Sequence, residues 1–413
     1  MPATMLQVKV IQSMQEVNQA DWDALVGNGS PFLEWGWLSS MEDARCVIPK
    51  TGWQSQHLAV YEGDRLVAAC PLYLKGHSMG EFVFDHSWAD AAQRAGIEYY
   101  PKMLVAAPFT PATGIRFLTA PGSDRRALIQ LLGQTLQEVC QKNDFSSVHV
   151  NFCLPDEAEA LAEIGYLKRV GLQYQWLNYD YQTFDDYLAH FRTKRRNQIK
   201  REMREMDLQG VTIEALSGDE IPDDLFPRMY TLYKAHLDKL YWGRQYLTPE
   251  FFDLLAERFR KNMCFVVARL QGRIIAGTVN IQKSGVLYGR YWGCFRELRH
   301  LHFNVCYYAA IEHCIKNRLI RFEPGAGGDF KRLRGFDPQP TVSMHFLAEP
   351  RLSEAVGHYL ERERDQVDNT IDWLQKESEL KLTETDAKLL PLCEPGKTGR
   401  QEERQEEGED EGE

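Results

Sequence analysis

Hydrophobic and polar positions alternate in a way that predicts the same hairpin at two places in the chain. Residues 58–75 (LAVYEGDRLVAACPLYLK) predict a strand, a Gly-Asp turn and a second strand. Residues 266–283 (VVARLQGRIIAGTVNIQK) align with them without gaps, so that Arg65 matches Arg273 and Ala68 matches Ala276. Each hairpin is therefore expected to belong to one copy of a repeated unit.

The segments after the two hairpins follow a common plan. Apolar residues at helical spacing predict a helix over 125–142, and a strand is expected over 147–152. The second copy continues with an expected strand over 286–295, a helix over 304–316 and a strand over 319–324. Strands and helices in this order favour two related α/β domains, each with a mixed sheet flanked by helices.

Helix start signals lie between the two copies. Thr183 with Asp186 forms a capping box, and Thr248 followed by Pro249 is a second N-cap signal. Apolar residues of helical period predict a further long helix near the end of the chain. We expect a first domain over 1–180, a second domain with a helical lead-in over 181–350, a closing helix over 351–380 and a disordered acidic tail over 381–413.

Composition agrees with this organisation. With 413 residues the chain is long enough for two cores, and its apolar fraction of 44% is that of a globular protein. No stretch approaches the roughly 18 apolar residues that cross a bilayer, and the N-terminus lacks the basic start and apolar core of a signal peptide. Nine cysteines occur without a CxxC pair, which favours reduced thiols in a cytoplasmic protein and no metal site.

The net charge of −11 is unevenly distributed along the chain. Residues 394–413 hold nine acids and three bases, a net charge of −6, which is typical of a solubilising tail. Residues 191–204 (FRTKRRNQIKREMR) hold seven bases and one acid. This segment is either a solvated helix face or an anion-binding face for a phosphate-rich partner.

A glycine-rich stretch, FEPGAGGDFKRLRGFDP at 322–338, follows the last expected strand of the second copy. It lacks the G-x-x-x-x-G-K-[ST] spacing of a nucleotide-binding loop, and it also fails the dinucleotide fingerprint G-x-G-x-x-G. A turn that brings Glu323 near Lys331 suits acyl transfer, because a carboxylate takes a proton from an attacking amine while a cation holds an anionic group. The alternative is a surface turn with a local ion pair.

The repeated order of hairpin, helix and strand resembles the GNAT acyltransferase fold. Three stretches resemble Fem-type aminoacyl transferases, namely RTKRRNQIKREMREMDLQGV, YLTPEFFDLL and FEPGAGGDFKRLRGFDP. Residues 82–118 and 323–345 are similar to the FemAB-like family of predicted N-acyltransferases. The resemblance implies a bacterial, cytoplasmic protein of tandem GNAT-like domains that transfers an acyl or aminoacyl group to an amine, such as one on a peptidoglycan precursor.

The resemblance also implies a mechanism and a choice of donor. The amine attacks a thioester or ester directly, with no tightly bound cofactor. GNAT proteins that bind CoA carry [QR]-x-x-G-x-[GA] before the central helix, whereas residues 296–302 (RELRHLH) contain no glycine. The donor is expected to be either acyl-CoA or an aminoacyl-tRNA, and a tRNA would face the basic helix at 191–204.

Candidate site residues come from both expected domains. Glu323 stands at a strand end beside the glycine turn, where a general base is needed, although a carboxylate that only stabilises the turn fits the same position. The candidate catalytic residues are Glu323, Asp329 and Tyr291. The irregular insert of the first domain is polar and aromatic, which is typical of a recognition loop. The candidate substrate- or donor-binding residues are Lys331, Arg334, His345, Trp242 and Arg244, with Asp85, Trp88, Tyr100 and Lys102 from this insert.

Two other functions fit the same sequence. One is a non-catalytic module, built on a duplicated GNAT fold, that only recognises a ligand or peptide. The other is an RNA-binding protein that uses the basic helix, whose affinity would fall steeply with salt. Convergence of Glu323, Asp329, Lys331 and Tyr291 on one cleft would favour the enzyme.

Overall fold

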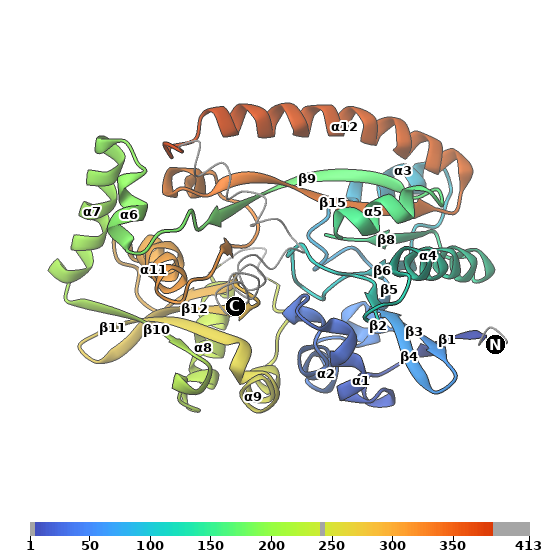
Figure 1. The fold of residues 1–413 in the computed structure, drawn as a ribbon, viewed down its shortest axis with the longest axis horizontal. Helices are drawn as coiled ribbons and strands as arrows, with labels where there is room; N and C mark the ends of the chain where they lie inside the picture. The colour runs from blue at the N-terminus through green and yellow to red at the C-terminus, as the bar shows by residue number, and fades with distance from the viewer. Residues whose placement is uncertain (1–4, 240–243, 383–413) are drawn as a thin grey trace, which may run out of the picture. The chain divides into compact units, whose positions relative to one another are not determined.

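The computed structural model describes residues 5–239 and 244–382 (Figure 1). The chain forms two compact units. Unit 1 comprises residues 1–172, 246–259 and 340–372, and unit 2 comprises residues 173–245, 260–339 and 373–413. Each unit therefore takes up separate stretches of the chain. The continuous domain boundaries expected from the sequence stay a prediction, and the tail expected over 381–413 lies outside the described residues beyond 382.

Unit 1 holds two groups of paired strands. One group has the order β1 (Leu6–Ile11), β3 (His57–Glu62), β4 (Arg65–Cys70) and β7 (Leu118–Thr119). The other has the order β15 (Asp337–Leu347), β8 (Ser147–Val150), β6 (Lys102–Val105), β5 (Leu72–Lys75) and β2 (Trp53–Ser55). The β6–β8 pair is parallel, with Met103 opposite Val148. The first expected hairpin is confirmed as β3 and β4. Its second strand, expected to run to Lys75, is divided into β4 and β5 at Pro71, which has no N–H for a continuous ladder.

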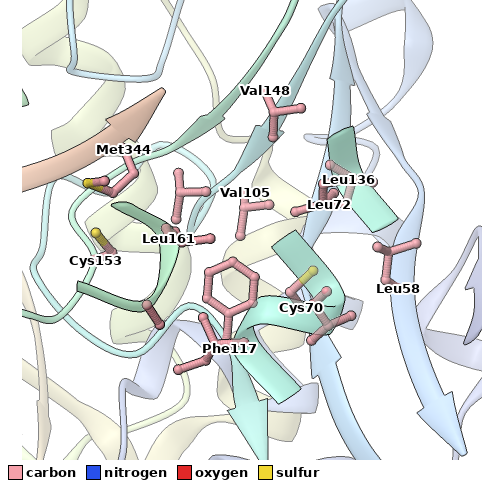
Figure 2. Packing of buried hydrophobic residues seen from close by; sticks show 14 of the residues in the cluster. Leu58, Cys70, Leu72, Val105, Phe117, Leu136, Val148, Cys153, Leu161 and Met344 are labelled. Carbon is pink, nitrogen blue, oxygen red and sulfur yellow. The ribbon is translucent and has the colours of Figure 1, made fainter. Parts of the chain in front are cut away.

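Amphipathic helices cover the strands of unit 1. The helix expected over 125–142 is confirmed as α4 (Arg125–Lys142), whose N-cap Asp124 accepts a hydrogen bond from Ala127 N. Leu128, Leu132 and Leu136 of α4 are buried against apolar side chains of the strands. Figure 2 shows this packing, in which side chains from β3, β5, β6 and β8 meet those of α4 and α5 (Pro155–Ala162). Each such side chain contributes about 1.5–3 kcal/mol by leaving water.

The remaining helices of unit 1 come from distant parts of the sequence. They are α1 (Gln19–Val26), α2 (Trp35–Asp43), α3 (His86–Arg94), α9 (Pro249–Arg258) and most of α12 (Pro350–Lys376). The N-cap expected at Thr248 is confirmed, since its hydroxyl accepts a hydrogen bond from Phe251 N at 3.3 Å. The long closing helix is α12.

Unit 2 contains a mixed sheet. Its strands have the order β10 (Val211–Ser217), β11 (Met263–Leu270), β12 (Arg273–Lys283), β13 (Val286–Cys294), β14 (Arg321–Glu323) and the end of β9 (Leu167–Leu177). Only the β13–β14 pair is parallel among these. The second expected hairpin is confirmed as β11 and β12.

Helices pack on the sheet of unit 2. They are α6 (Phe184–Ala189), α7 (Thr193–Leu208), α8 (Leu225–Leu237), α10 (Leu301–Phe303) and α11 (Ala309–Lys316), with a π-helical turn at Asn304–Tyr308. The capping box at the start of α6 is confirmed, with Thr183 and Asp186 exchanging hydrogen bonds. The mixed α/β architecture agrees with the expected fold class. No described helix of either unit is both long and apolar enough to cross a membrane.

Candidate functional site

A cavity opens in unit 2 where the two parallel strands separate. β13 pairs with β14 only from Val286 to Tyr288, and beyond this point β13 continues to Cys294 paired with β12 on its other edge alone. The cavity beyond this point has a volume of about 320 Å³ and is lined by residues of β12, β13, α10, the π-helical turn and the glycine-rich stretch. In open sheets, ligands commonly bind at the carboxyl ends of parallel strands. The same place is therefore the first candidate for a reaction site.

A β-bulge shapes one wall of the cavity. Val279 of β12 lies opposite Tyr291, but the next residue, Asn280, lies opposite Gly289. Arg290 is therefore the extra residue of β13, and such an insertion changes the direction in which neighbouring side chains point. Arg290 and Tyr291 both line the cavity although they are consecutive in a strand. The bulge gives the wall a guanidinium and a phenol side by side.

The opposite wall is a tight glycine turn. Gly325, Gly327 and Gly328 have φ angles of 83°, 73° and 92°, a region that side chains with a Cβ rarely adopt. The short helix Asp329–Arg334 follows and returns Lys331 to the cavity. Lys331 Nζ donates hydrogen bonds to the carbonyl oxygens of Gly325 at 2.6 Å and Ala326 at 3.3 Å. The lysine thus closes the turn that the glycines allow.

Lys331 is a buried cation. Its side chain is 2% exposed. Burial lowers the pKa of its ammonium from 10.5 to about 8, because the charged form loses hydration. Among the side chains that the structure describes around this cavity, Arg290 and Lys331 are basic and none is acidic. The cavity therefore favours a ligand that carries, or develops, negative charge.

Arg290 and His302 also contribute to the electrostatics of the cavity. Burial lowers the pKa of Arg290, and its hydrogen bond with Tyr291 opposes this effect. The Tyr291 ring packs against Tyr233 of α8, with centroids 5.2 Å apart. His302 also lines the cavity, and burial together with Arg334 lowers its pKa to about 4, so its imidazole is neutral at neutral pH. Neither Arg290 nor His302 was among the site residues predicted from the sequence.

The other candidates in unit 2 lie around the cavity rather than in its wall. Glu323 is buried and forms an ion pair with Arg321 at 3.2 Å. Its neighbours Phe322 and Pro324 both line the cavity, and the charge of Glu323 acts on the guanidinium of Arg290 in the cavity wall, where it opposes the lowering of the pKa by burial. Arg334 forms a buried ion pair with Glu202 of α7 at 2.8 Å. It anchors the short helix instead of facing the cavity.

The binding or catalytic roles predicted for three residues of unit 2 stay predictions. Arg244 is exposed at the edge of the described residues. Trp242 and the side chain of Asp329 lie outside the described part of the chain. Of the four residues whose convergence would favour an enzyme, Tyr291 and Lys331 share one cavity. The catalytic roles of Glu323, Asp329 and Tyr291 stay predictions.

Unit 1 brings its five candidates together in a second cluster, which is buried apart from the half-buried Tyr100. Lys102 donates hydrogen bonds to Asp85, to Glu81 at 2.8 Å and to Ser78 at 2.8 Å. Ser78 in turn bonds to the Tyr100 hydroxyl at 2.8 Å. The remaining two candidates join through His149: His345 Nδ1 lies 2.7 Å from His149 Nδ1, and Trp88 packs edge-on against His345.

Charges in this cluster compensate one another. Burial favours the neutral acid, but Lys102 and His149 hold the pKa of Asp85 below its usual value. Burial favours neutral lysine, yet Glu81 and Asp85 hold the pKa of Lys102 above its usual value. Burial lowers the pKa of His149 to about 3. Lys75 also lies 3.8 Å from Glu81, so two buried lysines face two carboxylates, beside imidazoles that burial keeps uncharged at neutral pH.

Comparison with known proteins identifies the family and the fold. The FemAB-like family model, described as peptidoglycan biosynthesis/recognition, matches residues 13–382. FemX is similar in structure, with a TM-score of 0.54 and 12% identity, covering 83% of this chain and 98% of FemX. The C-terminal domain of a putative lysylphosphatidylglycerol synthetase from Agrobacterium fabrum has a TM-score of 0.51 and 10% identity, covering 85% and 97%.

A third solved structure has the same fold. L-PGS from Bacillus licheniformis has a TM-score of 0.50 and 8% identity, covering 83% of this chain and 97% of L-PGS. A search of curated proteins finds no match. At these identities the structural likeness establishes the fold. The expected similarity to FemAB-like proteins is confirmed by the family match over most of the chain.

Proposed function

The chain belongs to the FemAB-like family, and on that premise we propose that it transfers an aminoacyl group to an amine in the cavity of unit 2. The observation that carries this proposal is Lys331, a buried ammonium at the cavity wall whose hydrogen bonds go to two carbonyl oxygens. An ammonium has three N–H donors. One donor is thus left for a ligand in the cavity.

The electrostatics of Lys331 suit the transition state of acyl transfer. When an amine attacks an ester carbonyl, negative charge develops on the carbonyl oxygen. No described acidic side chain lines the cavity to neutralise Lys331, so the ammonium interacts more strongly with this oxyanion than with the neutral ester. Stabilisation that increases along the reaction raises the rate, and one such donor typically contributes about 10²–10³-fold.

The transfer balances without a cofactor. The amine nitrogen forms a bond to the carbonyl carbon, and the bond between that carbon and the donor oxygen breaks. The proton that the nitrogen loses ends on the departing oxygen, which leaves as an alcohol. Tyr291 and the neutral His302 are the cavity groups that we assign to carrying this proton.

An aminoacyl-tRNA is the donor that we favour over acyl-CoA. The segment before α10 has no glycine from which backbone N–H groups would bind a pyrophosphate. Helix α7 carries a basic outer face of the kind that attracts a nucleic-acid backbone. The acceptor that we favour is the free amine of a peptidoglycan stem peptide, in keeping with the family description.

The proposal is tested by following a radiolabelled acyl group. The full chain is incubated with stem peptides that carry a free amine and with either a labelled aminoacyl-tRNA pool or labelled acyl-CoA. Transfer converts a base-labile ester into a base-stable amide on the peptide. We expect label on the peptide in the tRNA arm, and a loss of about 10²–10³-fold in Lys331→Met.

A matched control separates the effect of losing Lys331 from the effect of losing any lysine. Lys316→Met changes an exposed lysine of α11 and is expected to retain the wild-type rate. Transfer only from acyl-CoA would overturn the choice of donor. Binding of stem peptides without transfer from either donor would instead identify the chain as a recognition module.

A further inference from the structure

The outward face of α7 is a row of bases without described partners. Its buried positions are Ile199, Glu202 and Met206, which face the rest of unit 2. In a helix, residues four apart follow one another along one face, and those on the opposite side point to solvent. The bases for which the described residues provide no ion pair are Arg192, Lys194, Arg196, Arg201 and Arg204.

Unit 2 does pair other bases of the same helix. Lys200 forms an ion pair with Asp185 at 2.9 Å, and Arg195 forms one with Glu379 at 3.2 Å. Of the five remaining bases, Lys194, Arg201 and Arg204 follow one another along the exposed side of the helix, and the half-buried Arg196 lies at the edge of this side. These four bases form a cationic face, which we call the α7 face. Closely spaced like charges repel one another, so this face stabilises the binding of a polyanion.

The described chain ends beside this face. Leu380 forms a β-bridge with Phe191, and Lys381 N donates a hydrogen bond to His190 O at 2.8 Å. These contacts place residues 380–381 next to the residues that immediately precede α7. The acidic segment 394–413, with a net charge of −6, follows after a short connection. Most of the chain's excess negative charge is thus tethered to the start of its most basic helix.

We infer that residues 394–413 bind the α7 face of their own chain and shield it from other polyanions. A fully extended stretch of eleven residues, the number between Leu382 and Glu394, reaches at most about 40 Å, and a helix of the length of α7 measures about 24 Å. The segment is thus within reach of the whole face. Such tethering gives an effective concentration in the millimolar range, so a weak ionic contact is enough to occupy the face.

The contact would regulate the donor step of the proposed function. A tRNA that uses the α7 face must displace the acidic segment, and both contacts weaken as salt screens them. The inference about regulation rests on the proposed tRNA donor. The contact itself rests only on the α7 face, the end of the described chain and the charge of the segment.

The contact is tested in the full chain by carbodiimide cross-linking, which joins a carboxylate to an adjacent amine. We expect Lys194 and Lys200 to cross-link with peptides from residues 394–413 at low salt. The yield should fall at least about fivefold in 0.5 M NaCl, because the Debye length shortens to a few ångströms. Mixing light and isotope-labelled protein distinguishes contacts within one chain from those between chains.

A charge-reversal variant makes the test specific. Arg196→Glu, Arg201→Glu and Arg204→Glu together should abolish the cross-links to Lys194. The matched control reverses two exposed bases elsewhere in unit 2, Arg273 and Lys316, and should leave the cross-links unchanged. Acidic peptides that cross-link equally to exposed lysines over the whole surface would overturn the inference, as would an unchanged pattern in the triple variant.

Binding of labelled total tRNA separates this inference from the proposed function. Full-length protein with Glu402, Glu403, Glu406 and Glu407 changed to Gln should bind tRNA about three- to tenfold more tightly than wild type at low salt. The gain should disappear in the triple variant of α7. If neither form binds tRNA, the donor proposal fails and the cross-linking alone decides the contact. If tRNA binds equally to both forms, the regulatory inference is overturned.

Discussion

The buried Lys331 makes the stability of the protein depend on pH in a way that can be calculated. Burial lowers the pKa of its ammonium from 10.5 to about 8. Between these two values the unfolded chain holds more protons than the folded chain, so the free energy of unfolding rises with pH. The penalty for burying the charge is about 3 kcal/mol at pH 7 and falls below about 1 kcal/mol at pH 10.

The perturbation that isolates this contribution is Lys331→Met, which removes the titrating group and retains an apolar chain of similar length. The free energy of unfolding is measured by urea denaturation at pH 7 and pH 10 for wild type and variant. The difference, wild type minus variant, should rise by about 2 kcal/mol between the two pH values. Loss of the hydrogen bonds to Gly325 and Ala326 affects the variant equally at both pH values and cancels.

The control is a variant that removes an exposed lysine. Lys316→Met removes an exposed lysine, and its difference from wild type should stay constant with pH within about 0.5 kcal/mol. If Lys331→Met behaves in the same way, Lys331 titrates like an ordinary surface lysine and the electrostatic argument for its role is wrong. The same pKa predicts that transfer activity declines above about pH 8, since the ammonium then loses its proton.

Three further substitutions test buried interactions in the two units. Arg334→Met leaves buried Glu202 without its cation and should cost about 3–5 kcal/mol at pH 7. Since the partner of Arg334 has a lowered pKa, this cost should shrink as urea unfolding is repeated below pH 4.5. Leu136→Ala, in the core of unit 1, should cost about 2–5 kcal/mol in urea unfolding, against less than about 0.5 kcal/mol for exposed Leu208→Ala. Lys102→Met leaves buried Asp85 without its cation and Glu81 with Lys75 alone, and should lower the thermal midpoint, with partial recovery when Glu81→Gln is added.

Local sequence signals were sufficient for many of the elements. The helix α4 has the predicted limits because its apolar spacing and its N-cap are both set by neighbouring residues. The helix expected over 304–316 instead begins at Leu301 and passes through a π-helical turn. An extra residue in a helical turn depends on what the helix packs against, which periodicity does not record.

The cavity of unit 2 was only partly foreseeable. Lys331 was identified because a glycine turn and nearby cations are adjacent in sequence. Arg290 was not, because its place in the wall depends on a bulge that forms only when β12 and β13 pair. His302 follows the same rule, since its neutral state arises from burial and from the charge of Arg334. Properties that arise only when strands pair or side chains become buried cannot be predicted from the order of residues in the sequence.

The buried cluster of unit 1 shows that the same residue types occur both in exposed recognition loops and in buried polar networks. Polar and aromatic residues in an irregular insert are typical of a recognition loop, and they are equally typical of a network in which every charge is paired inside the protein. What separates the two is exposure, and Lys102 and Asp85 are almost completely buried. Removing a single charge from such a network leaves its partner buried and unpaired, which destabilises the fold. Binding a ligand instead requires polar groups that are accessible from solvent. The substrate-binding role of this cluster therefore stays a prediction, and the structure makes its contribution to the stability of unit 1 the first property to measure.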